Sequence, residues 1–222
     1  MNGTIRCLAF CMAGLGMLGS AGVQANIEPS STLEEGMEPA FSQAGFLYSL
    51  DAMAMPAGLA ADEIWVSVDL KSRLVMVYRG EYVMKRIEHL AYGAGGAAPL
   101  RAKGSSMTPL GEFRVDRINR ASRFGLFFGI DYPNAEVASE ALRIGKITPE
   151  EYHYIEAYRA RHGRAPHTTA LGGLIGLHGL GSGDPDVHRS FDWTEGCVAV
   201  DNYQIRALDP WLNIGTRVVI RG

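Results

Sequence analysis

Residues 64–87, IWVSVDLKSRLVMVYRGEYVMKRI, decide the fold class of this chain. The first seven place apolar side chains on one face at a period of two, which predicts a β-strand: Ile64, Val66, Val68 and Leu70. The tripeptide KSR predicts a turn, and LVMVY (74–78) and YVMKRI (82–87) predict two more strands around a Gly80-Glu81 turn. The stretch therefore predicts a β-meander that opens a folded domain.

Further short strands are predicted downstream, at 112–118, 126–130, 174–178 and 216–220. With the meander they make a mainly β domain that starts near Asp62 and runs to residue 222. No internal repeat is apparent in the sequence.

Two helices are predicted to interrupt the strands, as an insertion at about 134–163. Asn134 can cap a helix that runs to about Ile144, which Gly145 would end. Thr148, Pro149 and Glu151 predict the cap, the first-turn proline and the acidic partner of a capping box for a second helix. Gly163 would end that helix.

Residues 1–25 have the three-part pattern of a secretory signal: a cation at Arg6, an apolar run, and small residues ending at Ala25. The alternatives are an uncleaved anchor or a lipoprotein site at Cys11, which Phe10 disfavours. Residues 26–61 predict a flexible spacer, with a short helix near 41–53. The signal pattern predicts export, with no stable membrane span after cleavage; the family resemblance described below implies the periplasm or cell-wall space as the location.

Signal removal would take Cys7 and Cys11 and leave Cys197 as the single thiol. One cysteine cannot form an internal disulfide, and an unpaired thiol in an oxidising compartment requires a reason, such as chemistry or intermolecular pairing. The net charge of −3 and the scattered Lys and Arg residues give no general electrostatic reason to bind nucleic acid.

His178 ends an apolar stretch, and Cys197 follows 19 residues later in TEGC. A histidine within hydrogen-bond reach of a cysteine can take its proton and raise the thiolate fraction. Gly196 permits a sharp turn, so that amides around Gly196 and Cys197 can face a developing oxyanion. From these residues alone, a structural histidine and a core cysteine remain open alternatives.

The flanking motifs resemble the L,D-transpeptidase (YkuD-like) catalytic domain family. That family has a histidine at a strand end, followed by a Ser/Thr-x-Gly-Cys segment with a later asparagine. The matching stretches are MTPLGEF (107–113), FGIDYPNA (128–135), LHG (177–179), TEGCVAVDN (194–202) and IGTRVVI (214–220). The resemblance implies the family's β-sandwich or barrel-like catalytic fold over residues 62–222.

Carried over to this chain, the resemblance makes Cys197 the nucleophile and His178 its general base and acid. The family's supporting positions are Gly179, whose carbonyl partners the other ring nitrogen, Thr194 and Gly196 in the cysteine loop, and the structural Asn202. Two positions depart from the common pattern. Glu195 stands where many members have a second histidine, and Ala199 stands where many have an arginine.

The implied function is an exported cysteine-dependent L,D-transpeptidase of cell wall biogenesis and cell shape, with no cofactor and no metal. It would form a thioester with peptidoglycan tetrapeptide stems and transfer it to an amine, giving a 3-3 cross-link or attaching a protein. Two alternatives stay open. One is an L,D-carboxypeptidase or hydrolase that releases D-alanine or a wall-bound protein, and the other is a non-catalytic cell-wall-binding module. A papain-like or NlpC-like peptidase is disfavoured because its cysteine usually precedes its histidine.

The remaining candidate features have more ordinary interpretations. The acidic and histidine residues of one loop lack a standard metal-ligand pattern and predict a solvated loop with an exposed His188: Asp184, Asp186, His188 and Asp192. Residues 93–106 are glycine-rich without a phosphate-loop pattern and predict a mobile loop beside the cleft. Trp193 and Tyr132 are equally compatible with cleft and core. The helical pair is hypothesised to cap the cleft.

Overall fold

The computed structural model describes residues 55–222, which belong to one compact unit. The predicted signal at 1–25, the short helix near 41–53 and the spacer up to residue 54 lie outside the described residues. Among the helices of residues 55–222, none has the length and apolar character needed to cross a membrane.

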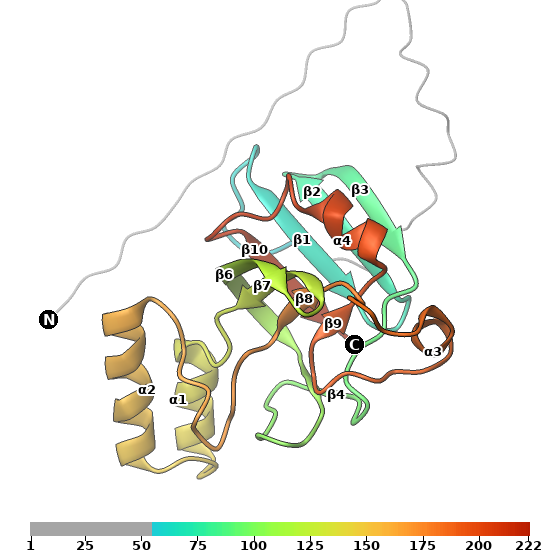
Figure 1. The fold of residues 1–222 in the computed structure, drawn as a ribbon. Helices are drawn as coiled ribbons and strands as arrows, with labels where there is room; N and C mark the ends of the chain where they lie inside the picture. Colours follow the sequence, from blue (N-terminus) through green and yellow to red (C-terminus); the bar gives the residue numbers. More distant parts are fainter. Residues whose placement is uncertain (1–54) are drawn as a thin grey trace, which may run out of the picture. The chain divides into compact units, whose positions relative to one another are not determined.

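An eight-stranded mixed sheet forms the centre of the domain, in the order β3-β2-β1-β10-β6-β7-β8-β9 (Figure 1). Its strands are β1 (Ile64–Asp69), β2 (Leu74–Arg79), β3 (Tyr82–Glu88), β6 (Gly111–Ser122), β7 (Gly125–Ile130), β8 (Gly176–His178), β9 (Val198–Ala199) and β10 (Arg217–Arg221). The β1–β10 and β8–β9 pairs are parallel and the others antiparallel. A two-stranded parallel sheet joins β4 (Ala97–Ala98) to β5 (Thr108–Pro109).

The two ends of the large sheet are tied together by one short bridge. The Ala91 amide, just after β3, donates to Ala199 O (3.0 Å), and the Ala199 amide donates back to Ala91 O (2.8 Å). Because Ala199 lies in β9, this bridge connects the first and last strands of the sheet order. The predicted mainly β, barrel-like class with a two-helix insertion is confirmed.

The strand that opens the domain is buried on both faces. Val66 and Val68 lie in the main core with Phe113 and Phe128, as the period of two predicts. On the opposite face Trp65 stacks on Tyr78, with ring centroids 4.4 Å apart. The predicted strand at 174–178 was too long. Leu174 has a φ of 60°, outside the range of a strand, and β8 begins only at Gly176.

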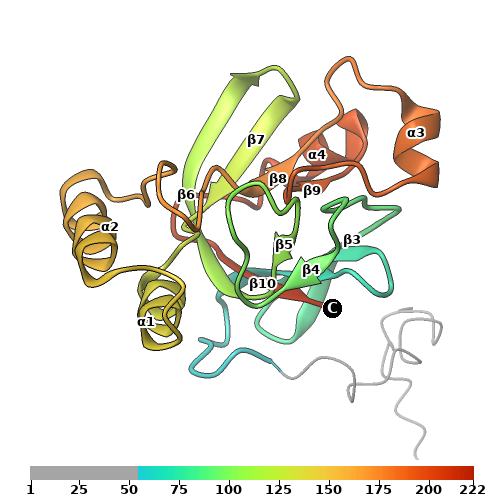
Figure 2. The ribbon, with the colours of Figure 1, turned by 90° about the horizontal axis from the view of Figure 1, so that it is seen from below.

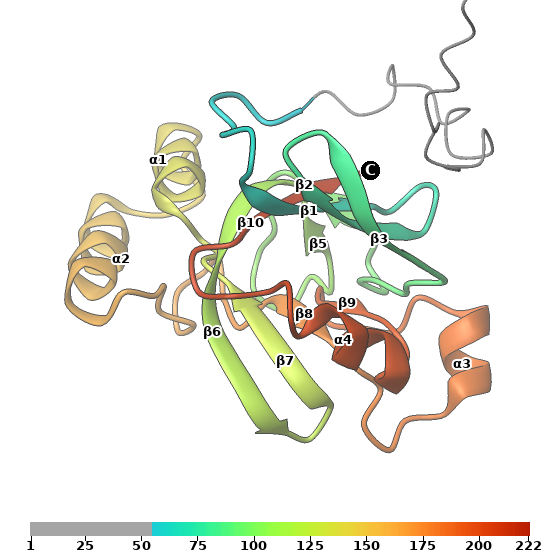
Figure 3. The ribbon, with the colours of Figure 1, turned by 90° about the horizontal axis from the view of Figure 1, so that it is seen from above.

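The two predicted helices, α1 (Ala135–Arg143) and α2 (Pro149–His162), are present with their expected caps. Asn134 Oδ1 accepts a hydrogen bond from the Val137 amide (2.9 Å), and Thr148 Oγ1 accepts one from the Glu151 amide (3.2 Å). The capping box was wrong, because the Glu151 carboxylate accepts from the Ala170 amide. The helices lie side by side on one flank of the domain, and α3 (Pro185–Ser190) lies on the opposite flank (Figures 2 and 3).

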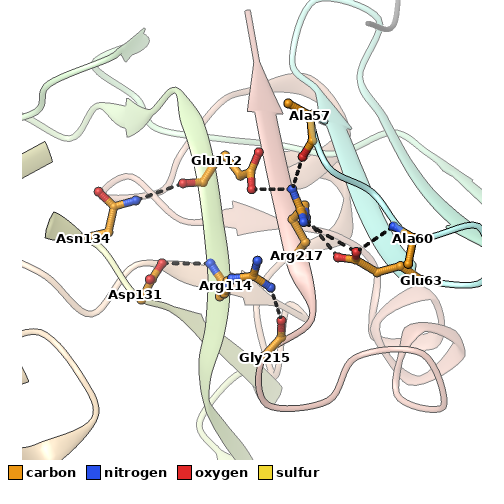
Figure 4. A network of polar contacts seen from close by, with 9 residues as sticks. All are labelled: Ala57, Ala60, Glu63, Glu112, Arg114, Asp131, Asn134, Gly215 and Arg217. Carbon is orange, nitrogen blue, oxygen red and sulfur yellow. Dashed lines mark hydrogen bonds and ion pairs between the residues drawn. The ribbon is translucent and has the colours of Figure 1, made fainter. Parts of the chain in front are cut away.

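Arg217 of β10 ties the start of the described chain to the sheet (Figure 4). Its guanidinium donates to Glu63 (3.0 Å), to Glu112 of β6 (2.8 Å) and to the carbonyl oxygen of Ala57 (3.2 Å). Leu59 also packs beside Trp65. Residues 57–61, which the sequence assigned to the spacer, are therefore attached to the domain.

Candidate active site

Parallel pairing of β8 with β9 brings His178 and Cys197 together. The register pairs Leu177 with Val198 and His178 with Ala199, so Cys197, one residue before β9, lies beside Gly176. Side chains alternate between the two faces of a strand. By this alternation, Cys197 and His178 project on the same face of the sheet, one strand apart, and both line the same cavity.

His178 is 2% exposed, and its surroundings fix its tautomer. Its ring stacks on Phe124, with centroids 4.1 Å apart, and meets Trp193 edge-on at 5.9 Å. Nδ1 lies 2.7 Å from the carbonyl oxygen of Gly179, the contact expected for the second ring nitrogen. A carbonyl oxygen only accepts, so Nδ1 carries the proton, and Nε2 of the neutral ring is left with a lone pair.

The pKa of His178 is lowered to about 4, mainly by burial and in smaller part by the positive charge of Arg123. The bond to Gly179 O acts in the opposite direction. Because the pKa lies well below 7, the imidazole is neutral at neutral pH and can accept a proton.

Cys197 is partly exposed at the residue level, while its thiol is enclosed. The thiol donates to the carbonyl oxygen of Leu174 (3.6 Å), and the hydrogen bonds of residues 55–222 include none between it and His178. Burial raises the pKa of Cys197 to about 11. The Gly176 backbone and the charges of Arg101 and Arg117 lower the thiol pKa, and Glu195 raises it.

The cysteine loop is held from within by Thr194. Its hydroxyl donates to the carbonyl oxygen of Cys197 (2.6 Å) and accepts from the Gly196 amide (3.1 Å). Gly196 has a φ of 119°, and a Cβ there would come within 2.4 Å of Met107 O. Only glycine fits this turn. Since the Gly196 amide is engaged by Thr194, the expectation that it faces the oxyanion is not supported.

Asn202, at the start of α4 (Asn202–Leu208), holds the chain that follows His178. Its Oδ1 accepts from the Gly181 amide (2.8 Å), and its Nδ2 donates to the Gly181 carbonyl oxygen (2.7 Å). Asn202 thus both accepts from and donates to the backbone of Gly181, as a residue of a paired strand does. These two bonds join the start of α4 to the segment that follows His178.

The cavity at the site has a volume of about 880 Å³ and a basic lining. The cationic side chains around it come from three stretches of the chain, the 93–106 segment, β6 with the turn after it, and the segment after α2: Arg101, Lys103, Arg117, Arg123 and Arg164. Glu195 is the acidic residue among the lining residues. The site therefore favours anionic groups, although the chain as a whole carries a net charge of −3.

A family model described as YkuD, the L,D-transpeptidase catalytic domain, matches residues 63–220. The chain belongs to the YkuD family. The resemblance seen in the sequence is thus confirmed. A comparison with curated proteins gave no match.

Solved structures similar to this YkuD domain include three bacterial proteins. The helical cell shape determining protein Pgp2 from Campylobacter jejuni has 16% identity, covers 72% of this chain and 48% of its own, and has a TM-score of 0.47. Bd1075 from Bdellovibrio bacteriovorus has 18% identity, 72% and 48% coverage, and a TM-score of 0.45. An L,D-transpeptidase from Xylanimonas cellulosilytica has 21% identity, 78% and 67% coverage, and a TM-score of 0.39. The chain spans about half the length of the first two.

The segment of acidic and histidine residues in this YkuD domain exposes Asp184 and Asp186 to solvent as predicted, but it is not entirely a loop. It contains α3, which Asp184 caps by accepting from the Asp186 amide (2.7 Å), and the Asp184-Pro185 sequence was the signal for it. His188 is buried, so its interpretation as an exposed loop histidine was wrong. Its Nδ1 accepts a hydrogen bond from Trp193 Nε1 (3.4 Å).

Asp192 forms an ion pair with Arg73, with 2.7 Å between Oδ1 and the guanidinium nitrogen. Residues 55–222 hold no cluster of three or more potential metal-ligating side chains.

The remaining candidates divide between cleft and core. Trp193 lines the cavity of the YkuD domain, whereas Tyr132 is buried in the core. Residues 93–106 lie beside the cleft as expected and supply Arg101 and Lys103 to its lining, and β4 anchors them. The capping hypothesis for the helical pair was wrong. Residues 135–162 contribute nothing to the lining, whereas the segment after α2 does, through Arg164 and Leu174.

Proposed function

We propose that this YkuD domain is an exported cysteine-dependent L,D-transpeptidase that acts on peptidoglycan tetrapeptide stems in the periplasm or cell-wall space. The observation that carries the proposal is the placement of His178 and Cys197 on one face of β8 and β9, at the wall of a basic cavity. Membership of the L,D-transpeptidase catalytic domain family supports the reaction class. Stem peptides carry free carboxylates, which suit a cavity lined by cations.

In the proposed first step, the thiol turns from Leu174 O toward Nε2 of His178, which accepts its proton. A bound substrate often tightens such contacts, which are loose in the free enzyme. The sulfur attacks the carbonyl carbon between the diamino acid and the terminal D-alanine. The amides of Cys197 and Gly176, beside the sulfur, are the proposed donors to the oxyanion. The C–N bond breaks, and the imidazolium gives its proton to the leaving amine, so the thioester remains on Cys197.

In the second step an amine attacks the thioester carbonyl and passes a proton to His178 Nε2, while the C–S bond breaks and the thiol is regenerated. An amine from a second stem gives a 3-3 cross-link, and one from a protein attaches that protein. Water in place of the amine gives hydrolysis. The shift of both pKa values toward the neutral forms supports a neutral thiol–imidazole pair before substrate binds.

The proposal is tested with purified protein, defined tetrapeptide muropeptides and mass analysis of the products. A 3-3 linked dimer supports transfer, whereas a tripeptide alone supports the hydrolase alternative. Intact mass after exposure to a carbapenem should show a covalent adduct that is absent in Cys197→Ala. Thr168→Ala, an exposed change that is outside the cavity lining, is the matched control. Turnover that persists in Cys197→Ala would contradict the proposed nucleophile, and no turnover in any assay favours a wall-binding module.

A further inference from the structure

Arg101 is a buried cation of the cavity wall that forms no ion pair with any carboxylate of residues 55–222. The residue is 5% exposed, and its Nε is enclosed without a hydrogen-bond partner in the described part of the chain. The ion pairs of residues 55–222 do not include it. A buried guanidinium is costly unless it is paired and hydrogen-bonded. Its retention in a basic cavity points to a ligand that supplies the missing anion.

The position of Arg101 is fixed by Tyr132, which is itself buried. The Tyr132 hydroxyl donates to the carbonyl oxygen of Arg101 (2.8 Å) and accepts from the Arg101 amide (3.2 Å). The guanidinium carbon lies 5.9 Å from the centre of the Tyr132 ring. Both bonds act on the backbone, so they anchor the residue and leave the guanidinium hydrogens for another partner.

Arg101 lines the same cavity as Cys197. Its charge interacts with the Cys197 thiol and with Glu195, and it lowers the thiol pKa. Ala199, where many family members have an arginine, is fully buried and is not part of the cavity lining. Arg101 therefore supplies a guanidinium to the cavity that Cys197 lines, from a segment that pairs with residue 194 through Gly93.

The chemistry of the proposed reaction defines which carboxylate belongs there, and this step rests on the proposed function. The amine that leaves from the terminal D-alanine sits on a carbon that also bears a carboxylate. An amino acid that attacks the thioester has the same arrangement at its reacting nitrogen. By microscopic reversibility, the leaving and attacking amines occupy one place, with the carboxylate one carbon from the reacting nitrogen.

We propose that Arg101 binds the α-carboxylate of the amino acid whose nitrogen leaves, or attacks, at the Cys197 thioester. The guanidinium fork matches a carboxylate in two parallel hydrogen bonds. Lys103 and Arg117 add to the positive potential that attracts the anion. The domain thereby selects substrates with a free carboxyl terminus.

The experiment compares three donors: a tetrapeptide with a free terminal carboxylate, the same peptide with a terminal amide, and a peptide with a free terminus whose other carboxylates are amidated. We expect wild-type kcat/KM to favour the free terminus over the amide by about ten- to hundredfold, as for a hydrogen bond to a charged group. In Arg101→Met this ratio should fall to near one, because the loss on the free terminus should exceed the loss on the amide, which reports only the effect of Arg101 on the thiol. Arg161→Met, an exposed arginine of α2 outside the cavity lining, is the matched control and should keep the wild-type ratio.

Three outcomes would overturn the assignment. Equal loss on acid and amide donors would mean that Arg101 acts through the thiol or the fold. An unchanged ratio would mean that another residue binds the carboxylate. If amidation of the other carboxylates of the stem, and not of the terminus, removed the preference, Arg101 would bind one of those other carboxylates. Melting temperatures of each variant establish that it is folded.

A second measurement separates this inference from the proposed function. Calorimetric binding of the acid and amide peptides to Cys197→Ala protein reports recognition without reaction. A preference for the acid that disappears in the Arg101→Met, Cys197→Ala double variant supports the inference even where no turnover is found. If the wild type turns over the donors but prefers the acid peptide over the amide peptide neither in binding nor in kcat/KM, the inference is wrong. The proposed function is not affected by that result.

Discussion

His178 is held as a neutral ring in a stack of aromatic side chains, so its protonation is linked to the stability of the domain. Its pKa falls from 6.5 in the unfolded chain to about 4 in the fold. Above pH 6.5 both states are neutral and the linkage contributes nothing. As the pH falls below 6.5, the unfolded state binds the proton first, and stability is lost until about pH 4.

We predict that the wild-type domain loses about 3 kcal/mol through this residue between pH 7 and pH 4, as the shift in pKa requires. Urea unfolding of the wild type and of His178→Gln, at a series of pH values, measures the difference in slope. Other titrating groups contribute equally to both proteins, so their effects cancel in the difference. One such group is Asp116, because burial raises its pKa to about 6. Parallel pH profiles of the two proteins would show that His178 is not the group responsible.

At the scale of elements, α2 is stabilised at its start by Thr148 and lies on the flank away from α3. We predict that Thr148→Ala lowers the free energy of unfolding by about 1 kcal/mol, because the Glu151 amide loses its acceptor. Turnover of the folded variant should not change, since residues 135–162 are absent from the cavity lining. Chemical denaturation and product analysis on the same samples test both parts. If Thr148→Ala lost turnover without losing stability, α1 and α2 would have a role in the active site, and the prediction would be wrong.

The elements that the sequence predicted well are those with local signals. Asn134 and Thr148 cap helices within a few residues of themselves, and the strands of the meander each carry their own period of two. The pairing of β8 with β9 has no such signal, because β9 is two residues long and each of its residues pairs with one 21 positions earlier in the chain. His178 and Cys197 were found through family-like motifs, whereas Arg101 depends on Tyr132 from a distant segment, which no local pattern encodes.

At the scale of the whole molecule, Arg217 joins three parts of the chain in one ion-pair network. We predict that Arg217→Met destabilises the domain by about 2 kcal/mol, because Glu63 and Glu112 lose their shared cation in a partly buried setting. Arg120→Met is the matched control, since its pair with Asp209 is exposed and should contribute less than about 1 kcal/mol. Thermal unfolding measures both changes. Limited proteolysis should cut residues 57–61 faster in Arg217→Met, and equal cutting in the two variants would contradict the role of Arg217 as a tether.

The parallel pair of β1 with β10 determines when the domain can assemble during synthesis. β1 is made early, yet one of its two neighbours in the sheet is made some 150 residues later, and β6 waits for the same strand. Until residues 217–221 leave the ribosome, the emerging chain presents unpaired strand edges at the middle of its sheet. Completion of the large sheet therefore waits for β10, the last strand of residues 55–222 in chain order. Until β10 is made, β1 and β6 lack the strand that joins them, so the two halves of the sheet cannot be hydrogen-bonded to each other at its middle.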